Sequence, residues 1–331
     1  MIFRTGITLL SLLLCMQSLV WAESVEKPLD PLVLQLRWIT QTQFAGYYVA
    51  LDKGMYRKNG LDVIILPGGP NLKPAQSLRE GLVDVSIEWL PHALVQREKG
   101  SDLVNIAQIF DRSGFTISCR KDHGIQNLED LQGKRVGSWF VGDEEKVRAL
   151  LRKKNIKVEF YPQNFNLDEL VSGKGDCIST MRYNEYLQLL DKGMQKEEII
   201  TFDFDALGMA MQEDGLYVTE QSLKQEGMED RLVRFVAATI QGWRYTLEHP
   251  EEALEIVLDN DPTGALDEHH QRKMLKVVMT LLHSKREQLG QLTQSQYHKT
   301  VDQLLEGGVL QYQDSGGYSE KIWNKAQLLL H

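Results

Sequence analysis

The chain has 331 residues and a formal net charge of −9, with 46 acidic and 37 basic side chains. Since no basic patch offsets this acidity, we expect no nucleic-acid partner. The three cysteines form no CxxC motif and no cysteine–histidine pair at ligand spacing, so the sequence predicts no metal site and no cofactor. The length is ample for a large core in one or two domains.

The first residues predict export. Arg4 precedes an apolar run at residues 7–15, and Val20-Trp21-Ala22 places small residues at the −3 and −1 positions of a cleavage site. We expect a signal peptide at residues 1–22, cleaved after Ala22, and a soluble periplasmic protein, because no later stretch approaches a transmembrane length. Lipid attachment at Cys15 stays an open alternative, although Leu14 is larger than the residue that usually precedes a lipidated cysteine.

Short apolar runs alternate with amphipathic segments in the first third of the chain. We expect strands at residues 32–38, 61–66, 83–87 and 103–110, and helices at 44–53, 75–80 and 91–99. After residues 115–118 the rhythm resumes with a strand at 134–139 and a helix at 143–153. It continues through 157–161, 167–173, 177–180 and 183–191 to a short strand at 216–219. This alternation is typical of mostly parallel sheets covered on both faces.

The rest of the chain carries a helical pattern only, at residues 232–248, 251–258, 269–282, 295–306 and 320–329. Helices without a strand of their own need a surface to cover. We therefore predict two α/β lobes with a cleft and two crossings, near residues 115–120 and 211–219. Lobe 1 would comprise residues 31–116 and 216–331, and lobe 2 residues 117–215. Whether Cys119 and Cys177 pair or stay separate buried thiols is open.

Ligands bind beyond the carboxyl ends of strands in open α/β sheets, which selects a set of candidate binding residues. These strand-end candidates are Trp38, Gln43, Gly69, Trp89, Trp139, Gly142, Glu144, Tyr183 and Glu185. Tryptophan stacks on flat rings, while carboxylates and amides bind ring nitrogens and amino groups. The set therefore predicts a planar, nitrogen-bearing ligand that is not strongly anionic.

Each candidate also has a purely structural interpretation. The tryptophans could pack in the core, and Gly69 could serve a simple turn between strand and helix. The acids at residues 143–145 suit the N-terminus of a helix without any ligand. No arrangement of nucleophile and base is indicated, so we expect no catalytic residue and no enzyme activity.

Residues 36–61 (LRWITQTQFAGYYVALDKGMYRKNGL) resemble the opening of solute-binding proteins related to uptake of thiamine pyrimidine precursors. Further similar stretches are DVIILPGG at 62–69, GLVDVSIEWLP at 81–91, DLQGKRVGSW at 130–139, YNEY at 183–186 and GWRYTLEHP at 242–250. The family shares ancestry with fungal thiamine pyrimidine synthases. The resemblance implies a type 2 periplasmic binding protein fold that closes about a hinge.

The resemblance also implies roles. Trp38 matches the family's strand-end tryptophan, and Gly46 and Tyr48 match its G-x-Y motif, which adds Tyr47 and Tyr48 to the candidate ligand-binding residues. The pyrimidine binders have Pro-Asn and a histidine where this chain has Thr40, Gln41 and Phe44. The cysteine-rich iron motif of the synthases is missing.

We therefore expect a monomer that delivers an aromatic nitrogen heterocycle, with a thiamine-related pyrimidine as the first candidate, to an inner-membrane ABC permease. The alternatives are a ligand sensor that feeds a membrane signalling partner and, less in keeping with the sequence, a pyrimidine synthase.

Overall fold

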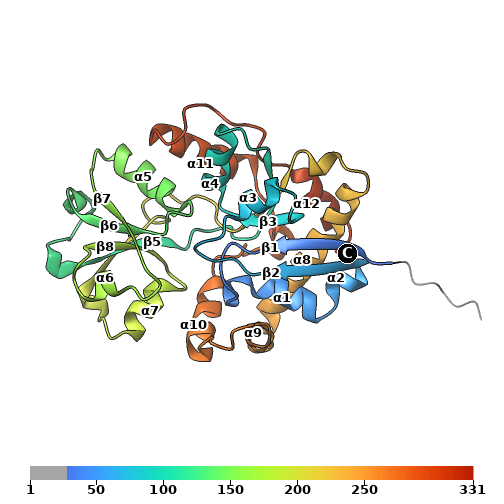
Figure 1. The fold of residues 1–331 in the computed structure, drawn as a ribbon, viewed down its shortest axis with the longest axis horizontal. Helices are drawn as coiled ribbons and strands as arrows, with labels where there is room; N and C mark the ends of the chain where they lie inside the picture. The colour runs from blue at the N-terminus through green and yellow to red at the C-terminus, as the bar shows by residue number, and fades with distance from the viewer. Residues whose placement is uncertain (1–27, 331) are drawn as a thin grey trace, which may run out of the picture.

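The structure, a computed structural model, describes residues 28–330. Two five-stranded sheets with surrounding helices lie side by side, one formed by the green part of the chain and the other by its blue and orange parts (Figure 1). This arrangement confirms the expected α/β class with two lobes. The predicted signal peptide and the question of lipidation at Cys15 lie outside the described residues.

The first sheet has the strand order β2-β1-β3-β10-β4. Its strands are β1 (Asp30–Gln35), β2 (Leu61–Leu66), β3 (Val85–Glu88), β4 (Leu103–Gln108) and β10 (Gly215–Thr219). β1 runs parallel to both β2 and β3, whereas β10 is antiparallel to β3 and β4.

The second sheet repeats this plan with the order β7-β6-β8-β5-β9. Its strands are β5 (Phe115–Arg120), β6 (Arg135–Ser138), β7 (Glu159–Pro162), β8 (Cys177–Met181) and β9 (Ile199–Asp203). β6 is parallel to β7 and β8, and β5 is antiparallel to β8 and β9. In each sheet one interior strand is antiparallel to its neighbours, β10 in the first and β5 in the second. Each of these is the first strand that the chain forms after it crosses from the other sheet.

The chain passes between the sheets at residues 109–114 and returns at residues 204–214. The first passage lies earlier than expected, because residues 115–120 form β5 within the second sheet. The second passage begins before the expected residues 211–219 and ends where β10 starts. Residues 115–120 were expected to form the first crossing, but they pair with β8 on one side and with β9 on the other. The limits of the lobes stay a prediction.

Helices cover both sheets. Around the first sheet lie α1 (Ala45–Asp52), α2 (Met55–Lys58), α3 (Pro74–Arg79) and α4 (Leu90–Glu98), and around the second α5 (Asp143–Lys153), α6 (Asp168–Val171) and α7 (Glu185–Asp191). The carboxyl-terminal helices are α8 (Met228–Glu248), α9 (Pro250–Asp259), α10 (Glu268–Val278), α11 (Gln294–Glu306) and α12 (Glu320–Gln327). No helix of the described part of the chain is long and apolar enough to cross a membrane.

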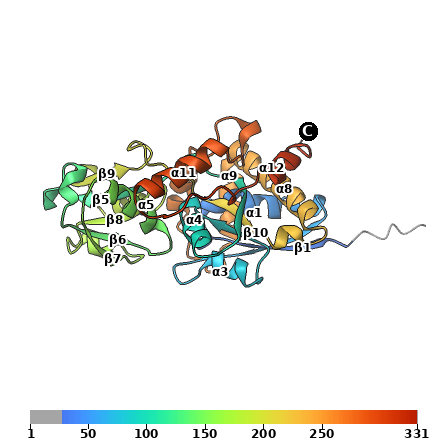
Figure 2. The same cartoon turned by 90° about the horizontal axis from the view of Figure 1, so that it is seen from above.

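The carboxyl-terminal helices return to the first sheet, as expected, but two of them also reach the second lobe. α8 packs against α1, and α12 packs against α8 and β4. α10 contacts α7, and α11 runs over to α5 (Figure 2). These two helices therefore contact both lobes beside the crossings.

Two features of the second sheet were not resolved from the sequence. Strand β9 was not predicted, although Ile199-Ile200-Thr201-Phe202 is rich in residues with high β-propensity. Cys119 and Cys177 lie opposite each other on β5 and β8 and form a disulfide. The open question of their pairing is thereby answered in the structure.

The contact between α1 and α8 depends on two glycines. A Cβ on Gly242 would overlap the carbonyl oxygen of Gly46, and a Cβ on Gly46 would overlap the indole ring of Trp243. Trp243 is fully buried and packs edge-on against Tyr47, with 5.8 Å between the ring centroids. The absence of a side chain at both positions lets the helices approach closely enough to bury this indole.

Gly242→Ala should lower the free energy of unfolding by about 3 kcal/mol, because the added methyl group meets backbone rather than a movable side chain. Urea denaturation measures this loss. Gly316→Ala is the control, since its new Cβ would meet only the end of the Arg97 side chain, and we expect a change within about 0.5 kcal/mol. Equal losses in both variants would contradict this packing account.

Candidate functional site

A small, partly open cavity of about 40 Å³ lies where the two sheets face each other. Its lining comes from both lobes: Arg37, Trp38, Gln41, Gln43, Trp89, Phe115, Trp139, Val141, Asp143, Ser179, Thr180, Met181, Tyr183, Asn184 and Glu185. A wider groove of about 610 Å³ adjoins it and shares Trp38, Gln41 and Asn184. Pockets for small ligands usually measure at least about 300 Å³, so the central cavity must widen to admit one.

Three aromatic side chains from both lobes meet where the central cavity adjoins the groove, with Trp38 and Trp139 lining the cavity and Phe165 lining the groove. Trp38 follows β1, whereas Trp139 and Phe165 follow β6 and β7 of the second sheet. The Trp38 ring lies 5.0 Å from that of Trp139 and 5.3 Å from that of Phe165, and the last two rings are 5.1 Å apart. Trp38 is buried, whereas Phe165 is half exposed. The trio therefore presents apolar ring faces that come from both lobes.

A buried carboxylate fixes the turn that carries Trp139. Asp143 is the first residue of α5, and its Oδ2 accepts hydrogen bonds from the Ser138 hydroxyl at 2.7 Å and from the Trp139 amide at 3.1 Å. Between them Phe140 adopts a left-handed backbone conformation with φ of 54°. The strand end, the turn and the helix start are thus joined around one side chain, which holds Trp139 at the cavity.

Arg37 bridges the lobes at the cavity wall. Its Nη1 donates to Glu88 Oε2 at 2.9 Å, and its Nη2 donates across the cleft to the Val141 carbonyl at 2.6 Å. The guanidinium carbon lies 4.2 Å above the Trp89 ring, a cation–π distance. The buried cation is therefore paired, and one of its hydrogen bonds forms only when the lobes are close.

Asp214 ends the second crossing and holds two residues of the cavity wall. Its Oδ2 accepts from Gln43 Nε2 at 2.6 Å, and its Oδ1 accepts from Trp89 Nε1 at 2.9 Å. Burial raises the pKa of Asp214 to about 6, although both hydrogen bonds oppose this rise. The carboxylate thus orients the Trp89 ring and the Gln43 amide from behind.

Glu185 is the buried carboxylate of the second lobe. Its Oε2 accepts from the Met181 amide at 2.8 Å, and its Oε1 accepts from Asn184 Nδ2 at 2.9 Å. Burial raises the pKa of Glu185 to about 7, with a smaller contribution from the charge of Asp143. Near neutral pH both the protonated and the ionised form of this carboxyl are populated. It can therefore donate a hydrogen bond to a polar group in the cavity or accept one from it.

The structure brings together six of the eleven candidate residues. Trp38, Gln43, Trp89, Trp139, Tyr183 and Glu185 line the central cavity. Tyr183 is fully buried, and burial holds the pKa of its hydroxyl well above the usual value.

The other five candidates lie outside the lining of this cavity. Tyr47 packs against Trp243 inside the first lobe, and the Tyr48 hydroxyl hydrogen-bonds to Thr40 Oγ1 at 2.8 Å. Gly69 lies in the loop after β2. The Gly142 backbone packs closely against His92, and Glu144 accepts a hydrogen bond from the Gly142 amide at 3.1 Å. Burial and the neighbouring Asp143 and Glu145 raise the pKa of Glu144. Their ligand roles stay predictions.

Several lining residues were not candidates. Ser179 and Thr180 lie within β8, and Asn184 follows its end, where the strand-end rule points. Asp143 lies next to the candidate Glu144. Arg37 precedes Trp38, but its reach across the cleft to Val141 leaves no sequence signal. Within residues 28–330 no group of three or more metal-ligating side chains could hold a metal ion.

A model of the family described as "NMT1/THI5 like" matches residues 41–253, more than half of the chain. The chain belongs to this family. The match spans Gln41, Gln43 and Trp89 of the cavity wall, both crossings and the whole second sheet. The resemblance seen in the sequence is confirmed.

Relatives of this NMT1/THI5-like protein have different names. A Haemophilus influenzae protein named for thiamine biosynthesis is 27% identical over 240 residues, which cover 70% of this chain and 74% of the relative. The formylaminopyrimidine-binding protein of Halalkalibacterium halodurans is 24% identical and covers 72% of each chain. A 4-amino-5-hydroxymethyl-2-methylpyrimidine phosphate synthase of Saccharomyces cerevisiae is 23% identical over 70% of this chain and 72% of its own.

A solved Candida albicans protein, described as having the generic periplasmic binding protein fold, superposes with a TM-score of 0.66. The superposition covers 90% of this chain and 96% of that one, at 17% identity. The NMT1/THI5-like protein therefore has the fold of periplasmic binding proteins, as the sequence resemblance implied.

The raised pKa of Glu185 predicts a pH-dependent stability. Because the pKa of about 7 in the folded protein exceeds the ordinary value of 4.5, the folded state binds this proton more tightly than the unfolded state. The resulting stabilisation is complete below the ordinary value and is lost as the pH rises through 7. In Glu185→Gln it should be absent, so the difference in unfolding free energy between wild type and variant should shift by about 3 kcal/mol between pH 8 and pH 4.5.

Urea denaturation of both proteins across this pH range measures the shift. Glu197→Gln, at an exposed position of the same lobe, is the control and should follow the wild-type profile. Parallel profiles for wild type and Glu185→Gln would show that Glu185 titrates normally.

Proposed function

We propose that this protein is exported to the periplasm, captures an aromatic nitrogen heterocycle of the aminopyrimidine class between its two lobes, and delivers it unchanged to an ABC permease. The observation that carries this proposal is the aromatic trio of Trp38, Trp139 and Phe165. Its two tryptophans line the central cavity together with buried carboxylates and amides. Flat rings gain most from such aromatic walls, while a few polar groups fix their orientation.

The polar groups of the cavity suit the edge of an aminopyrimidine. Glu185 and Asp143 provide carboxylate oxygens that accept from amino groups, and the amides of Gln41 and Asn184 can both donate and accept. Glu185 in its protonated form can also donate to a ring nitrogen. Carboxylates in the wall disfavour phosphates and sulfonates, because like charges at close range repel each other.

The names of relatives support binding and leave the chemistry to be tested. One relative is named for binding a formylaminopyrimidine and another for synthesis of a pyrimidine phosphate. Two of the three cysteines, Cys119 and Cys177, are joined in a disulfide, so neither offers the thiolate that a cysteine-ligated iron needs. This favours a carrier over a synthase.

The size of the cavity implies that capture requires movement. A space of about 40 Å³ is far smaller than the roughly 300 Å³ of an ordinary small-molecule pocket. A pyrimidine ring can enter only if the lobes separate or the aromatic trio turns. Closure of the lobes would then bury the ring and restore contacts such as that between Arg37 and Val141.

Trp139→Ala should weaken binding of 4-amino-5-hydroxymethyl-2-methylpyrimidine by about 1–3 kcal/mol, roughly five- to 150-fold, if the indole stacks on the ring. Isothermal titration calorimetry measures the affinity. Phe140→Ala removes the neighbouring aromatic side chain, which lies outside the lining of the central cavity, and is the matched control. We expect this control to bind as the wild type does.

The ligand class is tested separately by mass spectrometry of small molecules that copurify with the protein. A second assay titrates tryptophan fluorescence with pyrimidines, flavins and purines. The proposal predicts a copurified heterocycle and saturable quenching by a pyrimidine. Recovery of only sulfonates or other non-aromatic anions would contradict it, and turnover of the pyrimidine would identify an enzyme.

A further inference from the structure

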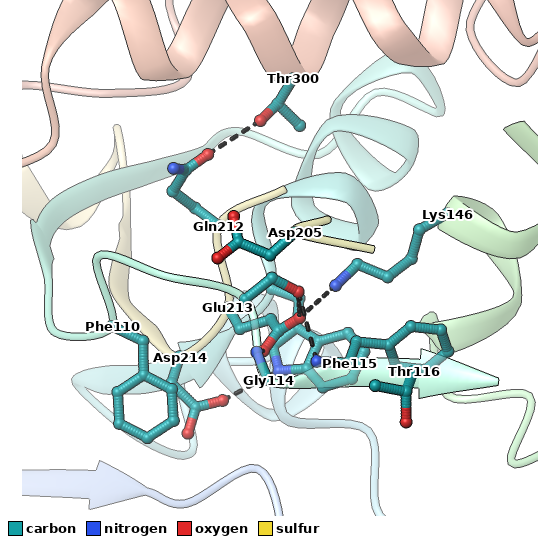
Figure 3. A network of polar contacts seen from close by, with 12 residues as sticks. Phe110, Gly114, Phe115, Thr116, Lys146, Asp205, Gln212, Glu213, Asp214 and Thr300 are labelled. Atoms are coloured by element: carbon teal, nitrogen blue, oxygen red, sulfur yellow. Dashed lines mark hydrogen bonds and ion pairs between the residues drawn. The ribbon is translucent and has the colours of Figure 1, made fainter. Parts of the chain in front are cut away.

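The second crossing ends in two consecutive buried acids whose side chains serve different lobes. Glu213 is fully buried, and Asp214 is buried with a left-handed backbone φ of 50°. Figure 3 shows both side chains beside the first crossing, between Phe110 and Phe115. Since burial of a carboxylate is costly without partners, the contacts of this pair restrict how the crossings can move.

Glu213 connects both crossings to the second lobe. Its Oε1 accepts from the Ser113 hydroxyl at 2.5 Å, and its Oε2 accepts from the Gly114 amide at 2.8 Å, both in the first crossing. Oε1 also forms an ion pair with Lys146 of α5, which is fully buried as well (Figure 3). One carboxylate therefore holds the two crossings and the helix of the second lobe together.

Among residues 28–330, Lys146 has no other anionic partner within hydrogen-bond reach. Its Nζ lies 4.6 Å from the centre of the Trp89 ring and 4.8 Å from that of Phe115, so aromatic faces surround the remainder of the cation. Burial lowers the pKa of Lys146, and the charge of Glu213 counteracts this. Separation of the pair during hinge motion would leave both charges buried and uncompensated. We therefore expect α5, which carries Lys146, to stay attached to Glu213 when the lobes move.

Asp214, the residue after Glu213, binds two residues of the cavity wall in the first lobe. It accepts hydrogen bonds from Gln43 and Trp89, and both of these residues line the cavity. Trp89 contacts both systems, since its N–H reaches Asp214 and its ring faces Lys146. A displacement of Trp89 or Gln43 therefore acts on the same short stretch of backbone that orients Glu213.

We propose that Glu213 and Asp214 are positioning residues for ligand capture, which couple the placement of Gln43 and Trp89 at the cavity to the orientation of α5 and its sheet. This inference rests on the proposed function in one respect: the central cavity has to be the ligand site. Helix α11 braces the same crossing, because Thr300 Oγ1 donates to Gln212 Oε1 at 3.0 Å (Figure 3).

The decisive variant carries Lys146→Met together with Glu213→Gln. It removes both charges at similar volume, and replacement of a whole buried ion pair is often neutral for folding. Lys321→Met with Glu229→Gln is the matched control, because this exposed ion pair joins α12 to α8 within one lobe. Nitroxide labels at Lys58→Cys and Lys157→Cys, in a Cys15→Ser background, report the distance between lobes by pulsed electron paramagnetic resonance.

In the protein without added ligand, we expect the double variant to broaden the distribution of distances between lobes, while the control matches the parent. With 4-amino-5-hydroxymethyl-2-methylpyrimidine as the probe, the double variant should bind about tenfold more weakly, a coupling typical between linked sites. Asp214→Asn should also weaken binding, because an amide cannot accept from both Gln43 and Trp89 through the same two oxygens.

If the double variant fails to fold, Ser113→Ala serves instead, because it removes one hydrogen bond to Glu213 and keeps the ion pair. It should broaden the distribution in the same direction, to a smaller extent. An unchanged distance distribution in a folded variant would overturn the inference. Failure of the parent protein to bind the probe would instead contradict the proposed function, and the distances without ligand would still decide on the hinge.

Discussion

Two buried carboxylates at the end of the second crossing restrict how the two halves of this molecule can be joined. Glu213 satisfies its charge with Lys146 and with donors of the first crossing, and Asp214 satisfies its own with Gln43 and Trp89. Because an unpaired buried charge costs several kcal/mol, these contacts persist only in a narrow range of arrangements. The geometry of the cleft is tied to this requirement, since Gln43 and Trp89, the partners of Asp214, also form its wall.

The cleft combines apolar faces that come from both lobes with polar groups held in place by their own partners. Trp38 approaches Trp139 and Phe165 across the cleft, whereas Asp143 and Glu185 are fixed by backbone amides of the second lobe. Aromatic contacts tolerate sliding and rotation, but hydrogen bonds do not. Such a division allows the aromatic walls to part for a ring while the groups that read its edge stay in position.

The sequence was informative wherever a local rule decides the outcome. Hydrophobic alternation predicted β2 and α5 with the bounds that the structure shows, and the strand-end rule selected Trp38, Trp89 and Trp139, all of which line the cavity. The strand-end rule could not tell which residue at the start of a helix faces the cavity. Asp143 and the candidate Glu144 are neighbours, but one residue corresponds to about 100° around a helix, so only Asp143 faces the cavity.

Long-range contacts set the limit of prediction. Asp214 lies in a crossing rather than at a strand end, and it meets Trp89, 125 residues away, only after both lobes have formed. The Lys146–Glu213 pair and the half-exposed Phe165 likewise depend on packing between distant segments. Strand β9 was missed although its composition favours a strand.

A crystal structure of the complex with 4-amino-5-hydroxymethyl-2-methylpyrimidine tests the central claim most directly. The account predicts the ring in an enlarged central cavity, with one face against Trp38 or Trp139 and its polar edge toward Glu185. A ring bound in the groove between α7 and α10, or a central cavity still filled by the aromatic trio at saturating pyrimidine, would contradict it.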